Sequence, residues 1–447
     1  MTLEGKRVIV VGMGRSGQAA SKLLKAKGAE VLVTDMRPEG EVAAAKGELE
    51  ALGIEVKAGG YDPDVFKGVS LVVLSPGVDP KEALWQGLRE EGIEVVGELE
   101  LASWWVSEPI IAVTGTNGKS TTTSLIGHLL RMAGKRIFVG GNIGAPLSEY
   151  VLDGERADLL VLEVSSFQLE TIRGFRPHIS VFLNISQDHL DRHRDFREYL
   201  LAKARIFENQ REDDFAVLNR DDPRIWGLIP GIRARPIPFS RMKTQEGVFV
   251  DGDSIRWSLS GEEGEISLGG LPLMGPHNLE NIMASLAVAL ICGVGREGIE
   301  EALRSFEPLP HRLQFVGEFR GVSFYDDSKA TNPDATLRAL EAFSRPVVLI
   351  AGGLNKGLDL GVLREGADRL RAIVTMGESA SRLEEVLGKE VPAVRACSMD
   401  DAVRKAFLLA RPGDIVLLSP ACASFDMFRD YKHRGEAFQE AVRRLKG

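Results

Sequence analysis

Short runs of apolar residues recur along the chain, and many of them end in a loop rich in glycine or polar residues. Stretches with helical character separate many of these runs. Continuous apolar runs are typical of strands buried on both faces of a parallel sheet, because neither face meets water. The alternation of strand and helix therefore predicts an α/β protein with open sheets. The clearest strands are expected at residues 6–11, 30–34, 69–74, 93–97, 110–113, 136–139, 158–164, 177–184, 215–219, 347–351 and 414–418.

The run 110–113 leads into Gly115 to Ser120 (GTNGKS) and then into a helical stretch. Glycines here let backbone N–H groups close around phosphate oxygens, toward which the helix turns its positive end. Lys119 supplies a mobile cation, and Ser120 offers a hydroxyl ligand for Mg²⁺. Val113 stands where the full nucleotide-binding pattern has its first glycine, so this is a shortened relative of that loop. The segment predicts a phosphate-binding site.

A second glycine loop, Gly12 to Gly17, follows the strand 6–11 and opens another helical stretch. Asp35 ends the next strand. This is the spacing of a dinucleotide-binding βαβ unit, in which a diphosphate sits at the helix N-terminus. The motif does not specify a nicotinamide, so an NAD-dependent oxidoreductase stays open as an alternative.

Two interruptions of the alternation predict domain boundaries. Ser107-Glu108-Pro109 breaks the helical stretch 98–105, which places a boundary near residue 97, and Glu307 to Arg312 reads as a rigid linker. A length of 447 residues fits three domains. We expect a Rossmann-like N-terminal domain, a central P-loop-type ATPase domain with a mostly parallel sheet and a small antiparallel excursion, and a Rossmann-like C-terminal domain, at residues 1–97, 98–306 and 307–447.

Composition narrows the classes of partner. The chain has 55 basic and 64 acidic residues, a net charge of −9 and no basic block, which argues against nucleic-acid binding. Its apolar runs are too short to span a membrane, and no secretory signal pattern is visible at the N-terminus. A cytoplasmic protein is expected. Three dispersed cysteines argue against a disulfide framework or a cysteine metal site.

Polar groups at further strand ends suggest where chemistry takes place. Glu163 lies inside an apolar strand and needs a partner, either a Mg²⁺ shared with Ser120 or a buried salt bridge. His189, bracketed by Asp188 and Asp191, is a candidate ligand or acid–base group. By its sequence context alone, Lys203 is a solvated helix lysine.

The last third repeats the pattern of strand ends with polar loops. Lys329 and Lys356 lie in small-polar or glycine-rich loops after two expected strands, and 419–426 follows the last one. Hydroxyls, amides and cations at three strand ends predict a site for an anionic ligand. Earlier, Asn278 precedes an expected helix at 282–292 and can act either as its N-cap or as a nucleotide contact.

Taken together, these motifs resemble the Mur ligases, most closely the members that add D-glutamate. The match covers nearly the whole chain and keeps the order of the family's motifs. The matching runs are GTNGKS at 115–120, GNIG at 141–144, EVSSFQ at 163–168, DHLDR at 188–192, HNLEN at 277–281, DSKATN at 327–332 and SPACASFD at 419–426. The shorter phosphate loop is normal in this family.

The resemblance implies an ATP-dependent ligase that joins D-glutamate to UDP-N-acetylmuramoyl-L-alanine through an acyl phosphate, during peptidoglycan precursor synthesis. It implies ATP and two Mg²⁺ sites as cofactors, and a cytoplasmic monomer without nucleic-acid or membrane partners. A ligase of the same type that adds another amino acid, an NAD-dependent oxidoreductase, and a nucleotide sensor without turnover are the alternatives.

The same resemblance implies roles for individual residues. The catalytic residues would be Lys119, His189 and Lys203. Metal would be held by Ser120, Glu163, His189 and Lys203, the last as a carbamate. ATP would contact Gly115, Thr116, Asn117, Gly118, Lys119, Ser120, Thr121, Asn278, Asn281, Arg312, Asp327 and Lys329. The UDP substrate would contact Gly14, Arg15, Ser16, Gly17, Asp35, Arg37, Ser75 and Asn142. D-Glutamate would contact Thr331, Lys356, Ser424, Phe425 and Tyr431.

Overall fold

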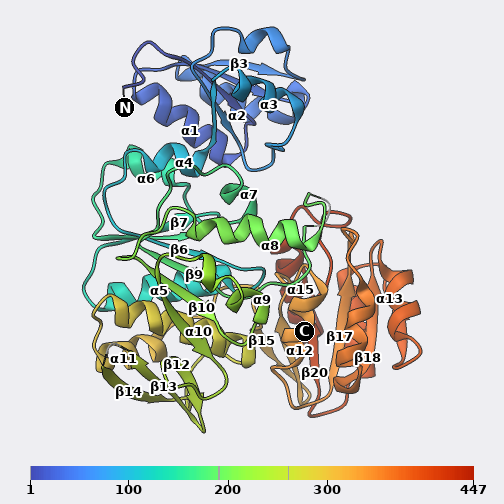
Figure 1. Ribbon diagram of the computed structural model, residues 1–447. Helices are drawn as coiled ribbons and strands as arrows, with labels where there is room; N and C mark the ends of the chain where they lie inside the picture. Colours follow the sequence, from blue (N-terminus) through green and yellow to red (C-terminus); the bar gives the residue numbers. More distant parts are fainter. Residues whose placement is uncertain (1, 190–191, 260, 447) are drawn as a thin grey trace.

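The computed structural model describes residues 2–189, 192–259 and 261–446, and contains three β-sheets (Figure 1). The N-terminal sheet lies above the central sheet in this view, and the C-terminal sheet lies beside the central one. Leu190 and Asp191, which belong to the run DHLDR, lie outside the described residues. The predicted α/β class with three sheets is confirmed.

The N-terminal sheet has five parallel strands in the order β3-β2-β1-β4-β5. The order reverses between β1 and β4, so the loops that leave these strands diverge and open a crevice. The elements are β1 (Arg7–Val11), α1 (Arg15–Ala26), β2 (Glu30–Asp35), α2 (Glu39–Ala51), β3 (Glu55–Ala58), the 3₁₀ turn η1 (Pro63–Phe66), β4 (Leu71–Leu74), α3 (Ala83–Glu90) and β5 (Glu94–Gly97).

The central sheet has nine strands in the order β14-β13-β12-β11-β10-β9-β6-β8-β7. The pairs from β7 to β12 are parallel, and β12, β13 and β14 pair antiparallel, as expected for the excursion. The strands are β6 (Ile110–Thr114), β7 (Ile137–Gly141), β8 (Leu159–Glu163), β9 (Ile179–Phe182), β10 (Phe215–Asn219), β11 (Arg235–Ser240), β12 (Gly247–Asp251), β13 (Ser254–Leu259) and β14 (Glu262–Ser267).

Helices cover both faces of this sheet. Successive residues of β6 join different cores, Ile111 and Val113 on one face and Ile110 and Ala112 on the other, as burial of both faces requires. The helical elements are α4 (Glu98–Ser103), α5 (Lys119–Met132), α6 (Leu147–Asp153), α7 (Ser166–Leu169), α8 (Phe196–Ala204), η2 (Arg205–Phe207), α9 (Pro223–Trp226), η3 (Ile229–Gly231), α10 (Pro276–Ile291) and α11 (Arg296–Ser305).

The C-terminal sheet has six strands in the order β15-β16-β20-β17-β18-β19, parallel except for the β15–β16 hairpin. The last strand in sequence, β20, is therefore central in the sheet. The elements are β15 (Gln314–Phe319), β16 (Val322–Asp326), α12 (Pro333–Leu340), β17 (Val347–Gly352), η4 (Leu360–Arg369), β18 (Leu370–Met376), α13 (Ala380–Leu387), β19 (Ala393–Arg395), α14 (Met399–Leu409), β20 (Ile415–Leu418) and α15 (Tyr431–Lys446).

The connections between the sheets contain no strand. Residues 98–109, with α4, join the first sheet to the second, and residues 268–313, with α10 and α11, join the second to the third. We propose that the domain boundaries lie near residues 97 and 306, because all strands of each sheet come from one of the three resulting segments. Among the described helices, none is long and apolar enough to cross a membrane.

Candidate active site

The phosphate loop leaves the carboxyl end of β6, which lies between β8 and β9 in the sheet. Gly115 and Gly118 have φ angles of +151° and +84°, values that L residues with a side chain rarely adopt. Gly118 caps α5, and a Cβ there would overlap Asn281 Oδ1. Lys119 Nζ donates to the carbonyls of Gly115 (2.9 Å) and Thr116 (2.8 Å). The loop therefore has the predicted strand–glycine–helix geometry.

A cavity of about 320 Å³ opens in front of this loop and is shared by the central and C-terminal domains. It collects the carboxyl ends of β6, β8, β16 and β20, together with the loops after β9 and β17. Its lining includes Thr116, Asn117, Gly118, Lys119, Ser120, Asn142, Glu163, Ser165, Ser166, Phe167, Asp188, His189, Lys203, Arg312, Lys329, Thr331, Asn332, Lys356, Ser424, Phe425 and Tyr431. The structure thus brings together residues that are more than three hundred positions apart.

Glu163 is buried at the end of β8, beside the phosphate loop. Asn142 Nδ2 donates to its Oε1 at 2.8 Å, whereas its Oε2 is buried and has no hydrogen-bond partner within the described part of the chain. A buried carboxylate oxygen without a partner is costly unless a cation or proton satisfies it. Among the described residues, no group of three or more His, Cys, Asp or Glu could hold a metal by itself. A cation at Glu163 would also need other ligands, such as Ser120 and phosphate oxygens.

Lys203 is fully buried, so the interpretation as a solvated helix lysine is wrong. Its Nζ donates to the carbonyl of Gly115 at 2.8 Å and lies 4.7 Å from the ring centre of Tyr199. Burial, helped by the charge of Lys119, holds the pKa of Lys203 well below its usual value. Because α8 is nearly as polar on its buried side as elsewhere, its sequence periodicity did not reveal this.

His189 lies beside Lys203 in the cavity lining, in a loop where its φ is +55°. Its Nε2 is 3.8 Å from Asp188 Oδ2, and its ring packs edge-on against Phe167. Burial lowers the pKa of His189, so the imidazole is neutral and one ring nitrogen can act as a metal ligand. His189 thus lines the cavity, and its role as a ligand or acid–base group stays a prediction.

A smaller pocket of about 70 Å³ adjoins the cavity and shares Asn117, Gly118, Arg312 and Lys329 with it. Asn278 lies inside α10, so its expected role as an N-cap is wrong. Gly275 is the N-cap, and Asn278 Nδ2 instead donates to the Met274 carbonyl (2.7 Å). The predicted nucleotide contacts that line this pocket are Asn117, Gly118, Thr121, Asn278, Asn281, Arg312, Asp327 and Lys329. Gly115 lines neither pocket.

The C-terminal side of the cavity is strongly cationic. Burial and the charges of Arg312 and Lys119 lower the pKa of Lys329 to about 8, and its Nζ lies 4.1 Å from the ring centre of Tyr431. Lys356 enters from the loop after β17. Burial also raises the pKa of Asp327 to about 7, although Ser419 Oγ donates to it at 2.9 Å. Such a concentration of cations favours anionic ligands.

A separate cavity of about 630 Å³ lies in the crevice of the N-terminal sheet. Its lining includes Gly14, Arg15, Ser16, Asp35, Arg37 and Ser75. Asp35 accepts from the Met13 N–H (2.6 Å) and from Arg37, and these contacts lower its pKa to about 2 against the effect of burial. Gly17 does not line the cavity. A Cβ on Gly17 would overlap the Gly12 carbonyl oxygen, so it allows α1 to pack against the loop.

Three family descriptions match consecutive parts of the chain. They are the Mur ligase MurD-like N-terminal domain at residues 6–97, the Mur ligase middle domain at 113–289, and the Mur ligase glutamate ligase domain at 311–422. A UDP-N-acetylmuramoylalanine–D-glutamate ligase from Caldanaerobacter subterraneus subsp. tengcongensis is 43% identical, with 100% of each chain covered. The ligase of that name from Desulfosudis oleivorans is 45% identical over 99% of this chain and 97% of its own. The chain belongs to the Mur ligase family.

Solved structures of Mur ligases share the fold at low identity. MurF ligase from Thermotoga maritima, in complex with ADP, has a TM-score of 0.63 at 18% identity, covering 99% of this chain and 96% of its own. MurC from the same organism has a TM-score of 0.59 at 19% identity, covering 98% and 99%. The predicted three-domain fold and the resemblance to the Mur ligases are confirmed.

The sequence reasoning missed several residues of this Mur ligase site. Ser166 and Phe167 lie in the quoted run EVSSFQ but received no role, and they line the cavity. Asn332 Nδ2 donates to Asn117 Oδ1 (3.2 Å), and Asn117 Nδ2 donates to Asp334 Oδ2 (2.7 Å). These contacts join the central and C-terminal domains across the cavity, and no local pattern in the sequence could have paired residues so far apart.

Proposed function

We propose that this Mur ligase adds D-glutamate to UDP-N-acetylmuramoyl-L-alanine with the hydrolysis of ATP to ADP and phosphate. The observation that carries the proposal is the single cavity in which a phosphate loop faces Glu163 and buried Lys203, with a cationic C-terminal wall opposite. Full-length relatives at 43% and 45% identity bear the name of this activity.

The first step joins the carboxylate of the alanyl residue to the γ-phosphate of ATP. A carboxylate oxygen attacks phosphorus, the bond to the β-phosphate oxygen breaks, and ADP leaves. Lys119, now folded back on the carbonyls of its own loop, is placed to move onto the phosphates and neutralise their charge. The adenosine part would occupy the small pocket lined by Asn278, Asn281 and Arg312.

The residues present fit a Mg²⁺ ion. Ser120 and the unpartnered Oε2 of Glu163 would hold one ion, which would offset charge on the β- and γ-phosphates when bound. His189 and Lys203 would be ligands of a second ion. An ammonium cannot bind a cation, but addition of CO₂ to a neutral Lys203 amine gives a carbamate with oxygen donors and releases one proton. The lowered pKa of Lys203 favours the neutral amine that this addition requires.

The second step forms the amide. The amine of D-glutamate, in its uncharged form, attacks the acyl carbon and gives a tetrahedral intermediate, from which phosphate and one proton leave. Lys356 and Thr331 line the cavity from the C-terminal domain, with Ser424, Phe425 and Tyr431, and would hold the glutamate carboxylates. Water must be kept from the acyl phosphate, and the contacts between Asn117 and Asp334 hold the two walls together for this purpose.

The N-terminal cavity would hold the UDP part of the substrate. Arg15 and Ser16 at the start of α1 would contact the diphosphate, and Asp35, Arg37 and Ser75 would contact the uridine; all five line this cavity. Asn142, which the family resemblance assigns to the muramoyl-alanine part of this substrate, lies in the central cavity beside Glu163. It would contact the muramoyl-alanine end.

Phosphate release measured with UDP-N-acetylmuramoyl-L-alanine, ATP and single amino acids tests the proposal. We expect release with D-glutamate and less than a hundredth of that rate with L-glutamate, D-alanine or L-lysine. Release with another amino acid alone would make the chain a Mur ligase of different specificity. ATP binding without release would make it a sensor, and reduction of a nicotinamide would place it among the oxidoreductases.

A further inference from the structure

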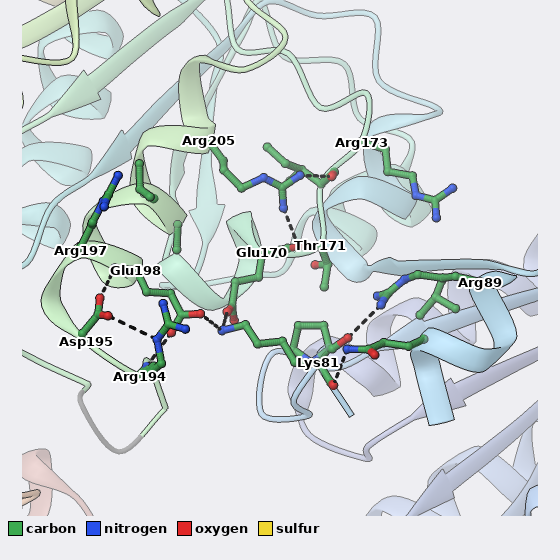
Figure 2. Close-up of a pocket in the computed structure, with 16 residues that line it drawn as sticks. Lys81, Arg89, Glu170, Thr171, Arg173, Arg194, Asp195, Arg197, Glu198 and Arg205 are labelled. Carbon is green, nitrogen blue, oxygen red and sulfur yellow. Dashed lines mark hydrogen bonds and ion pairs between the residues drawn. The ribbon is translucent and has the colours of Figure 1, made fainter. Parts of the chain in front are cut away.

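A further cavity lies away from the site described above, between the N-terminal and central domains. It has a volume of about 880 Å³ and is lined by α3 and β5 on one side and by α8 and residues 170–173 on the other (Figure 2). Lys81 extends across it from the N-terminal domain. Its Nζ lies 3.1 Å from Glu170 Oε1 and 2.9 Å from Glu198 Oε1, both in the central domain.

Arg192 makes the reverse connection. It belongs to the central domain, and its guanidinium donates to the carbonyls of Gly77 (3.3 Å) and Val78 (2.8 Å) in the N-terminal domain. It also lies 3.3 Å from Glu170 Oε2. Two cations from opposite domains thus share one carboxylate, whose side chain is 6% exposed. The segment that they fix, residues 75–81, also supplies residues 75–79 to the wall of the N-terminal cavity.

Glu170 leads from this contact toward the active-site cavity. His193 Nδ1 lies 3.8 Å from Glu170 Oε1, and His193 Nε2 lies 3.1 Å from Ser166 Oγ. The imidazole is fully buried between Phe167 and Tyr199, and its Nδ1 has no hydrogen-bond partner among the described residues. Ser166 lines the cavity that holds Glu163. A line of polar groups therefore connects the two domains with the reaction site.

The order of these groups sets the direction of the hydrogen bonds. The His193 ring lies between a carboxylate on its Nδ1 side and a hydroxyl on its Nε2 side. With the proton on Nδ1, toward the Glu170 carboxylate, Nε2 accepts a hydrogen bond from the Ser166 hydroxyl. The lone pairs of Ser166 Oγ then face the cavity. Ser166 is thereby fixed as an acceptor toward a donor group of the substrate.

We propose that Lys81, Glu170 and His193 are positioning residues that act through Ser166 on the UDP-sugar-peptide substrate. Lys81 and Glu170 hold the N-terminal domain in position against the central domain. His193 orients the Ser166 hydroxyl, which accepts a hydrogen bond from an N–H or O–H of the sugar-peptide. The position of the N-terminal domain and the orientation of the sugar-peptide end of the substrate are thus coupled. The inference rests on the proposed function.

Steady-state kinetics with each substrate varied in turn tests this role. In Lys81→Met, Glu170→Gln and His193→Gln we expect the KM for the UDP substrate to rise about tenfold, and the KM for ATP to change less than twofold. Arg194→Met is the matched control, because the Arg194 side chain lines the same cavity but forms its ion pair with its neighbour Asp195, within one domain. Equal changes in both KM values, or none in Lys81→Met, would overturn the proposal.

A double-mutant cycle separates positioning from a purely structural role. Glu170 and His193 lie between Lys81 and Ser166. Residues without direct contact normally have additive effects. We expect Lys81→Met to raise the KM of a Ser166→Ala enzyme by less than twofold, although it raises that of the wild type tenfold. An undiminished tenfold effect refutes the coupling.

Two measurements keep the outcome interpretable. Lys81 is 42% exposed, so Lys81→Met should fold even if Glu170→Gln does not, and far-UV circular dichroism checks this. A wild-type enzyme that releases no phosphate with D-glutamate would refute the proposed function. An active wild type whose Lys81→Met variant is kinetically unchanged would refute the positioning role alone.

Discussion

His277 provides a quantitative test of the nucleotide pocket through pH. It is the second residue of α10, its Nδ1 is buried without a hydrogen-bond partner in the described part of the chain, and it lines the small pocket. Burial, and then the charge of Arg338, lower the pKa of His277 from 6.5 to about 4. The folded protein therefore resists protonation of this ring, whereas the unfolded chain does not.

The sign and size follow from proton linkage. Between pH 6.5 and pH 4 the unfolded state binds more protons at this residue, so acidification destabilises the fold. Above pH 6.5 the ring is neutral in both states and costs nothing. A shift of 2.5 pKa units corresponds in full to about 3.4 kcal/mol, and the part lost between pH 7 and pH 5 is about 2 kcal/mol.

Urea unfolding at pH 7 and pH 5, for the wild type and for His277→Asn, isolates this contribution. All other groups titrate in both proteins, so the wild type should lose about 2 kcal/mol more than the variant. Arg338→Gln should narrow this gap, because it removes the cation that opposes protonation and leaves Asp334 to favour it. Equal losses in wild type and His277→Asn would show that the imidazole is solvated and that the pocket is open to water.

Three further predictions concern the active site. Lys203→Met should lower kcat at least a thousandfold while the protein stays folded, because a thioether fills the buried space but cannot carry a carbamate. An active wild-type enzyme whose crystal structure shows an unmodified Lys203 would contradict the metal-ligand role. Gly118→Ala should weaken ATP binding at least tenfold, since its φ of +84° and the overlap with Asn281 both resist a Cβ, and unchanged affinity by calorimetry would contradict this. The affinity of that variant for UDP-N-acetylmuramoyl-L-alanine is the internal control. Asp334→Ala removes the hydrogen-bond partner of Asn117 and Ser186. It should raise the KM for ATP and D-glutamate about tenfold and lower the free energy of unfolding by less than about 1 kcal/mol. An unchanged KM would mean that these hydrogen bonds do not hold the cavity closed.

Most of the fold was predictable because its signals are local. The buried strands of parallel sheets read as apolar runs, and the glycines of the two loops stand where the backbone needs positive φ or close packing. The phosphate loop could be placed from Gly115 to Ser120 alone, since strand, turn and helix N-terminus are contiguous. The order of strands within each sheet was not encoded in this way, and the central position of β20 appears only in the folded chain.

Features that depend on distant partners were not predictable from the residues alone. Lys203 looks like a surface lysine because α8 shows no apolar stripe, and only packing against Tyr199 and the Gly115 carbonyl buries it. Asn278 had the residue type of an N-cap, but α10 begins at Pro276, which is pre-organised for a first helical position. Lys81 and Glu170 are ordinary charges in sequence, and their pairing follows from how two domains meet.

The phosphate loop and the contact at Glu170 both depend on residues from a neighbouring domain. Each domain alone offers only a partial site: a nucleotide crevice, a phosphate loop or a cationic wall. A ligase must bring an acyl phosphate and an amine together while excluding water, so its chemistry depends on the contacts between domains as much as on catalytic groups. Asn117 with Asp334 fixes one of these junctions, and Lys81 with Glu170 fixes the other. Substitutions at such polar and charged residues should therefore impair catalysis while leaving each domain's core intact.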